Sequence, residues 1–122
     1  MPEVRGGYIK ASYVASGNLS QYRFVAAAGV DVWHSPTSGD VVLGVTLNHP
    51  NNNEEATLVT LGHAKVLVAS SLGANARVMN GANGFAVVAT SGQFVAGRLI
   101  SNADSGLPAE MIVSGYMTDA IG

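Results

Sequence analysis

The sequence contains no cysteine, which excludes a disulfide framework, a thiol nucleophile and a cysteine-bound metal. Charge is also scarce, because Asp, Glu, Lys and Arg make up only 11% of the 122 residues, whereas ordinary domains contain about 25%. The net charge of −2 provides no basic surface for a phosphate backbone, so we expect no nucleic-acid partner. A chain with few charges and many small residues suits a protein whose exterior is partly covered by other protein.

Long apolar runs are absent as well. No run approaches the roughly 18 residues that span a bilayer, so we expect no membrane partner. The first seven residues, Met-Pro-Glu-Val-Arg-Gly-Gly, lack the apolar core of a signal peptide, which predicts synthesis in a cytoplasm. The length of 122 residues is enough for one domain with its own core.

Catalytic and metal-binding motifs are missing too. The sequence has no phosphate-binding P-loop and no Gly-x-Ser-x-Gly elbow. The three histidines stand far apart, and residues 51–55 lack the spacing of an EF-hand calcium loop. His34 with Asp31 or Asp40 suggests a hydrolytic triad, but no oxyanion-hole motif accompanies it. We predict a protein that is not an enzyme, with no catalytic, cofactor-binding or metal site.

What the sequence does contain is an internal repeat. The segment from Thr37 to Gly62 has a second copy 53 residues further along the chain (92 − 39 = 53). Each copy reads as a turn, a strand with one glycine inside it, a polar excursion and a return strand. A glycine inside a strand suggests a bulge or a close crossing of backbones. We predict two related β-hairpin units in one small domain. The matched pairs are Thr37/Thr90, Gly39/Gly92, Val42/Val95, Gly44/Gly97, Leu47/Ile100, Ala56/Ala109 and Gly62/Gly115.

The remaining pattern predicts short strands separated by turns. Residues 21–28 alternate with a period of two, as in a strand with one wetter face. Residues 41–47 are almost wholly apolar, as in a strand covered on both faces. Residues 57–61 and 64–69 are predicted as two strands, with Gly62-His63 between them. About nine such strands, with turns every 8 to 12 residues or so, indicate an all-β fold, a small antiparallel β-sandwich or β-barrel.

The N-terminal segment is predicted as an extended arm. Residues 1–18 carry apolar residues in isolated pairs between flexible ones, and we assign residues 19–122 to the single β domain. One interpretation is a frayed terminus, and the other is an arm that becomes ordered on a partner. Trp33, the only tryptophan, would be a good interface anchor if exposed. The candidate partner-binding residues are Val4, Tyr8, Ile9, Tyr13, Val14 and Trp33.

Seven segments, taken in order, give the chain a family resemblance. They are residues 22–25 (Tyr-Arg-Phe-Val), 39–45 (Gly-Asp-Val-Val-Leu-Gly-Val), 64–66 (Ala-Lys-Val), 72–78 (Leu-Gly-Ala-Asn-Ala-Arg-Val), 83–87 (Asn-Gly-Phe-Ala-Val), 95–99 (Val-Ala-Gly-Arg-Leu) and 110–113 (Glu-Met-Ile-Val). From Gln21 to Val113, this order resembles the small capsid decoration, or cement, proteins of tailed bacteriophages.

The resemblance implies a β-rich, β-tulip-like domain on the outer surface of a phage head, often as a trimer at local threefold positions. There it would bridge neighbouring major capsid proteins, with residues 1–18 extended over the capsid. The expected partners are the major capsid protein and further copies of the chain, as a homotrimer or a dimer, and the expected location is the virion. Two alternatives stay open: a head-fibre or carbohydrate- or receptor-binding module that uses Trp33, and a small β-fold enzyme.

Overall fold

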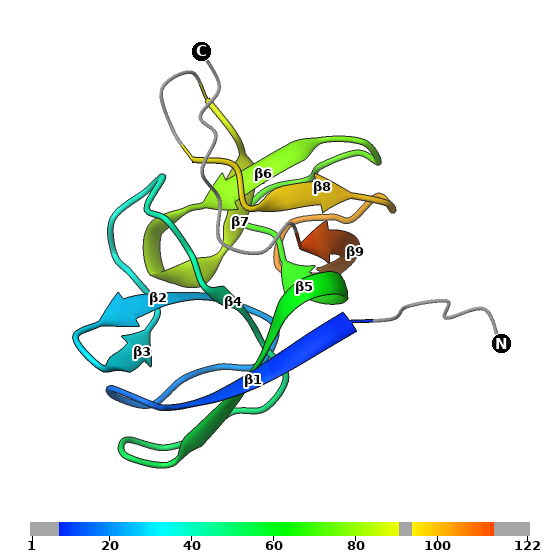
Figure 1. Cartoon of the computed structure of the whole chain (residues 1–122). Helices are drawn as coiled ribbons and strands as arrows, with labels where there is room; N and C mark the ends of the chain where they lie inside the picture. The colour runs from blue at the N-terminus through cyan, green and yellow to red at the C-terminus, as the bar shows by residue number, and fades with distance from the viewer. Residues whose placement is uncertain (1–7, 91–93, 114–122) are drawn as a thin grey trace, which may run out of the picture.

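The computed structural model describes residues 8–90 and 94–113. Over these residues the chain is all-β, as predicted, with nine strands and one short 3-10 helix (Figure 1). Runs rich in Val, Ala and Thr between Gly and Asn turns account for the strands. The elements are β1 (Tyr8–Val14), β2 (Phe24–Ala28), β3 (Asp31–Trp33), β4 (Gly44–Thr46), β5 (Glu55–Leu67), β6 (Arg77–Asn80), η1 (Ala82–Gly84), β7 (Ala86–Val88), β8 (Gly97–Leu99) and β9 (Pro108–Val113).

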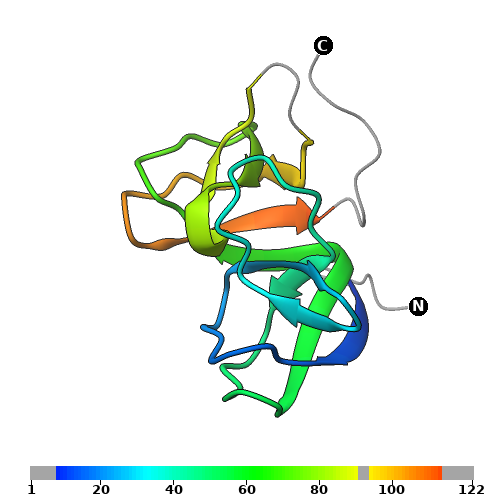
Figure 2. The same cartoon turned by 90° about the vertical axis from the view of Figure 1, so that its left-hand side faces the viewer.

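The strands form one antiparallel sheet that curls on itself. Its order is β3-β2-β4-β5-β9-β8-β6-β7, and β1 also pairs with β5. Figure 2 shows β1–β4 in one half of the molecule and β6–β9 in the other, with β5 running through both. The first half of β5 pairs with β1 and the second half with β9. The chain therefore consists of unit 1 (residues 8–61) and unit 2 (residues 62–113), which share a continuous strand.

The two units have the same hydrogen-bond register. β4 pairs Thr46 with Leu58, and β8 pairs Leu99 with Met111, each residue lying 53 positions further on (99 − 46 = 53; 111 − 58 = 53). The ladders of β2 with β4 and of β6 with β8 are related by the same offset, as are those of β1 with β5 and of β5 with β9. The predicted repeat is thus confirmed beyond the predicted hairpins, and only β3 and β7 depart from the offset, because they are related by 54 residues (86 − 32 = 54).

Each unit closes on itself in the same way. In unit 1, a parallel bridge joins Ala15 to Val32, and in unit 2 the equivalent bridge joins Val68 to Ala86. These bridges connect the first strand of each unit to its third, so that five strands wrap around a small interior. Each unit is therefore a partly closed, curled sheet, which agrees with the predicted small β-barrel or β-sandwich.

β5 corrects one strand prediction. We predicted two strands separated by Gly62-His63, whereas β5 is continuous across both residues. Gly62 has φ of 107°, in the region that favours glycine, so the chain changes direction there without breaking its hydrogen bonds. The glycine marks the boundary between the units rather than a loop.

Two apolar clusters hold the structure together. The smaller one lies inside unit 1, and the larger one joins the outer face of unit 1 to the interior of unit 2. The smaller cluster contains Ala15, Leu19, Val25, Val32, Ala56 and Leu58. To the larger one, unit 1 contributes Phe24, Val42, Val45 and Val59, and unit 2 contributes Ala64, Val66, Val68, Val78, Ala86, Ala96, Leu99, Ala109, Met111 and Val113.

The packing of β2 corrects the prediction that one of its faces is wetter. Phe24 and Val25 are both fully buried, although they point to opposite faces of the strand. Val25 packs into the smaller cluster and Phe24 into the larger one. The alternation in the sequence is therefore real, but the interior of unit 1 covers Val25, on the face of Arg23 that we expected to be wetter, and unit 2 covers the face of Phe24.

The N-terminal segment is partly a strand of the sheet. Tyr8–Val14 pair with β5 from Gly62 to Glu55, and Ala15 and Leu19 belong to the smaller cluster. Residues 1–7 lie outside the described residues. The domain boundary at residue 18 and the contact of this segment with a partner stay predictions.

The two strand glycines lie where backbones cross, as the repeat predicted. A Cβ atom on Gly44 would lie 2.2 Å from the carbonyl oxygen of Val59, and one on Gly97 would lie 2.1 Å from that of Ile112. These two contacts are related by the offset of 53 residues (112 − 59 = 53). Since neither glycine has a positive φ, close approach and not backbone strain requires it.

We expect Gly44→Ala and Gly97→Ala each to lower the free energy of unfolding by about 2–3 kcal/mol or more, because the new methyl group would force two backbones apart. Urea unfolding measures the change. Gly73→Ala is the matched control, since the nearest atom to its Cβ would be 3.7 Å away, and it should change stability by less than about 0.5 kcal/mol. Wild-type stability in Gly44→Ala would contradict the close crossing.

Candidate functional site

Two of the predicted partner-binding residues lie on one surface. The parallel bridge between Ala15 and Val32 sets the end of β1 beside β3, with Val14 level with Asp31 and Ser16 level with Trp33. Val14 is 42% exposed and Trp33 is 39% exposed. We call the area around Val14, Asp31 and Trp33 the β1–β3 surface. A partly exposed tryptophan beside an exposed valine is a suitable anchor for a protein or a sugar ring.

The other end of β1 carries a second exposed apolar pair. Ile9 is 58% exposed and stands opposite Leu61 of β5, which is 45% exposed. Sequence analysis identified Ile9 but missed Leu61, the last residue of the predicted strand 57–61. The position of Leu61 just before Gly62, at the end of unit 1, is the sequence signal that could have identified it as exposed.

The other three predicted partner-binding residues do not belong to either exposed pair. Tyr13 is half-buried and packs against the smaller cluster, so its role is at least partly structural. Tyr8 is the first residue of β1. Val4 lies outside the described residues. The structure therefore places Val14 and Trp33 on the same surface, sets Ile9 at the other end of β1 and turns Tyr13 towards the core.

A shallow polar hollow adjoins Trp33. Arg23 spans it, because Nε and Nη2 of its guanidinium donate to the carbonyl oxygen of Asn83, with Nε at 3.1 Å. Burial lowers the pKa of Arg23, which nevertheless stays a cation. The hollow is lined by Ser16, Asn18, Ser20, Arg23, Trp33 and Asn83.

His34 also lines this hollow, and backbone groups hold both of its ring nitrogens. Its Nε2 accepts the amide hydrogen of Ser20 at 2.8 Å, so Nδ1 carries the proton and donates it to the carbonyl of Phe24, also at 2.8 Å. Burial lowers the pKa of His34, and the positive charge of Arg23 lowers it further. His34 therefore connects the loop before β2 to β2 itself as a neutral imidazole.

The suggested triad is not assembled at His34. The carboxylate of Asp40 accepts hydrogen bonds from the hydroxyl of Ser35 and the amide of Val41, both at 2.8 Å. Asp31 begins β3, and its strand partner is Ala28. Both ring nitrogens of His34 are engaged by the backbone instead.

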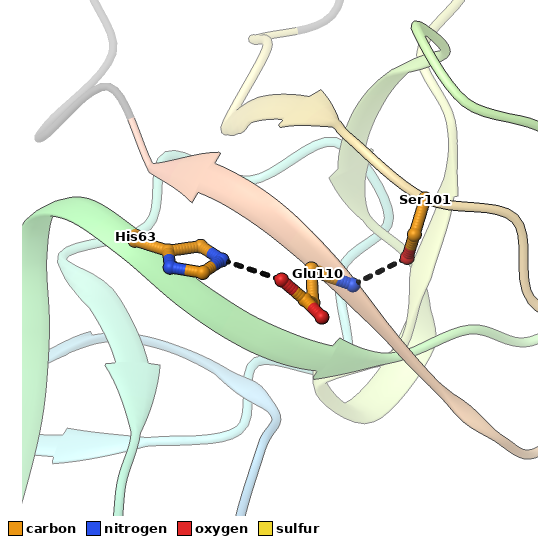
Figure 3. A network of polar contacts seen from close by, with 3 residues as sticks. All are labelled: His63, Ser101 and Glu110. Atoms are coloured by element: carbon orange, nitrogen blue, oxygen red, sulfur yellow. Dashed lines mark hydrogen bonds and ion pairs between the residues drawn. The ribbon is translucent and has the colours of Figure 1, made fainter. Parts of the chain in front are cut away.

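A second histidine pairs with a carboxylate on the outer face of unit 2 (Figure 3). Nε2 of His63, on β5, lies 2.9 Å from Oε1 of Glu110 on β9. The amide of Glu110 donates to the hydroxyl of Ser101 at 2.9 Å, which fixes the strand position of the carboxylate. The side chains are 23% and 48% exposed, so this pair contributes at most about 1 kcal/mol.

Within residues 8–90 and 94–113, no three His, Asp or Glu side chains gather closely enough to hold a metal ion. The same residues contain no helix long and apolar enough to cross a membrane.

The geometry defines a class: a small all-β protein made of two joined, partly closed five-stranded units. No protein-family model matches the chain, and no curated protein sequence matches it either. Its fold is similar to that in the crystal structure of the head fiber gp8.5 N base of bacteriophage phi29, with a TM-score of 0.73 and 17% sequence identity. The match covers 93% of this chain and 99% of that chain. At this identity, the likeness shows a shared fold.

His34 makes stability depend on pH. Because its pKa is lowered from 6.5 in the folded protein, the unfolded chain binds more protons below about pH 6.5, and the free energy of unfolding falls as the pH drops. We expect the loss between about pH 7.5 and 5.5 to be smaller in His34→Gln than in the wild type, since His49 and His63 remain in both. Urea unfolding at the two pH values measures it, and an equal loss in both proteins would exclude His34 as the cause.

Proposed function

We propose that this chain is a structural protein of a bacteriophage head, which attaches to the outer surface of the capsid. The observation that carries the proposal is the fold shared with the phi29 head fiber base over nearly the full length of both chains. The exposed apolar residues of β1 and β3, Ile9, Val14 and Trp33, supply anchors for such an attachment. In this proposal the chain has no substrate and catalyses no reaction.

In the finer form of the proposal, the chain bridges neighbouring major capsid proteins as a cement protein. A ligand that binds only the intact shell stabilises it by RT ln(1 + [L]/Kd), which is about 2.7 kcal/mol per site at a hundredfold excess over Kd. Contact with two subunits at once adds avidity without a large area on either. Further copies of the chain, as a homotrimer or a dimer, would multiply this effect.

A direct test mixes the purified chain with expanded, empty heads of the virus that encodes it. We expect saturable co-sedimentation and a rise in the melting temperature of the heads, because binding stabilises the occupied shell. Replacing Ile9, Val14 and Trp33 by serine together should weaken binding at least tenfold, which corresponds to about 1.4 kcal/mol or more.

Leu107→Ser is the matched control, since Leu107 is 54% exposed in a loop of unit 2. It should bind as the wild type does. A chain that stays in the supernatant with every head preparation of its virus would refute the proposal. Binding without any rise in melting temperature would favour a fibre base over a cement protein.

A second candidate function is glycan or receptor binding at the hollow beside Trp33. It is favoured by a partly exposed indole next to amide, hydroxyl and guanidinium groups, an arrangement that suits a sugar ring. We expect Trp33→Ala to abolish glycan binding. The same variant should still bind phage heads through the surface around Ile9 of β1. A glycan array probed with the wild type and with this variant tests the prediction. If the wild type binds no glycan on the array, the glycan-binding function is rejected.

A further inference from the structure

The hollow beside Trp33 presents hydrogen-bond donors and one cation. Its charged residue is Arg23, and it also contains the hydroxyl of Ser16, the amide of Asn18 and the indole of Trp33. Among the described residues, no carboxylate lines the hollow. A ligand that enters it therefore meets a positive charge with no negative charge beside it.

The guanidinium of Arg23 is held in a fixed position. Its Nη1 donates to the hydroxyl of Ser20 at 3.0 Å, and its Nε and Nη2 donate to the carbonyl oxygen of Asn83. Its central carbon lies over the ring of Phe85, 4.3 Å from the ring centre. A side chain that is already immobilised loses little conformational entropy when it binds a ligand. Arg23 is therefore preorganised for a contact in the hollow.

These contacts leave part of the guanidinium unused. Nη1 and Nη2 each carry a second N–H beyond the one that they donate here. Within the described part of the chain, Arg23 has no ion pair with a carboxylate. Burial lowers the pKa of Arg23 from its ordinary value, so the cation has lost hydration without gaining a counter-charge. An anion that accepts the remaining N–H groups would supply that counter-charge.

The polar groups around Arg23 also have capacity for a ligand. Oδ1 of Asn18 accepts the amide hydrogen of Asn52 at 2.9 Å, which leaves Nδ2 of Asn18 as a donor. Neither the indole N–H of Trp33 nor the hydroxyl of Ser16 has a hydrogen-bond partner within residues 8–90 and 94–113. The indole is 39% exposed, so its ring offers an apolar surface beside these donors. A few polar groups next to an aromatic surface are typical of a small-molecule site.

His34 does not offset the charge of Arg23. Burial in the first place, and the positive charge of Arg23 as well, lower the pKa of His34, which is therefore neutral at neutral pH. This effect also means that the field of the guanidinium reaches across the hollow. Asp31 and Asp40, the acids nearest to His34 in sequence, do not line the hollow. The positive potential is therefore available to a ligand.

We propose that this hollow binds an acidic saccharide, with its carboxylate on the guanidinium of Arg23 and its ring against the indole of Trp33. A carboxylate fits because it is planar and accepts two N–H groups of a guanidinium at once. A neutral sugar leaves the cation without a counter-charge, so the site discriminates against it. This inference rests on the glycan-binding candidate function and not on attachment to a capsid.

The first experiment compares sugars that differ only in the acidic group. The methyl glycosides of glucuronic and galacturonic acid are titrated into the full chain beside those of glucose and galactose, with the NMR signal of the Trp33 indole N–H as the readout. We expect at least one uronic acid to bind about tenfold or more tightly than its neutral counterpart, because a hydrogen bond to a charged group is the stronger one. This preference should shrink as salt is raised.

Two variants with the same change of net charge assign the preference to one arginine. Arg23→Gln keeps a donor for the carbonyl of Asn83 but removes the cation, so it should bind the acidic and the neutral sugar equally. Arg77→Gln removes an exposed cation from β6 and should keep the wild-type preference. Circular dichroism and melting temperature check that both variants are folded. If Arg77→Gln loses the preference as well, net charge and not the hollow selects the sugar, and the inference is overturned.

Acetate tests whether the sugar ring takes part, since it carries the carboxylate alone. It should bind at least about tenfold more weakly than the preferred uronic acid, because it lacks the contact with Trp33. Acetate that binds as tightly as the sugar overturns the inference in favour of a simple anion site.

The wild-type titrations separate this inference from the function on which it rests. Equal binding of acidic and neutral sugars overturns the inference but leaves the glycan-binding function in place. If the wild type binds none of the four glycosides, the inference is also overturned, and the glycan array then decides the broader function. Neither result depends on the binding of the chain to phage heads.

Discussion

The continuity of β5 is the constraint on which the rest of the structure depends. Its first half completes the ladder of unit 1, and its second half begins that of unit 2, so the position of one unit dictates that of the other. The outer face of unit 1 is thereby brought against the interior of unit 2, where Phe24, Val45 and Val59 are fully buried. Gly62 provides the one change of direction that this arrangement requires.

Where sequence analysis succeeded, it did so through residues with a single physical explanation. Gly44 and Gly97 stand at the same place in both copies because a side chain at either would collide with a carbonyl oxygen. This collision excludes any side chain at these two positions, whatever else surrounds the strand. The two glycines therefore revealed both the repeat and the close approach of the backbones. The all-β class followed from short alternating runs and turn residues, which also act locally.

Where it failed, the missing information was long-range. Leu61 and Val59 both read as interior residues, yet one is exposed and the other fully buried, because only Val59 faces the second unit. The arginines at 77 and 98 are far apart in sequence, and only the sheet register sets them opposite each other. For His34, the pattern suggested acid partners, whereas the fold supplied two backbone groups. Candidate surfaces of this kind depend on packing between units, which no single segment encodes.

A last consequence concerns the independence of the two halves. Cutting the chain after Leu61 would leave the strand pairs of unit 1 in place except that of Tyr8 with Gly62. It would also expose to water the aromatic ring of Phe24 and the three valines of unit 1 in the larger cluster. Burial of such side chains is worth about 1.5–3 kcal/mol each, and the loss would approach the whole stability of a small domain. Although the molecule is built from two units with related strand ladders, the shared cluster makes unit 1 dependent on unit 2 for its stability, so we expect the two units to unfold together.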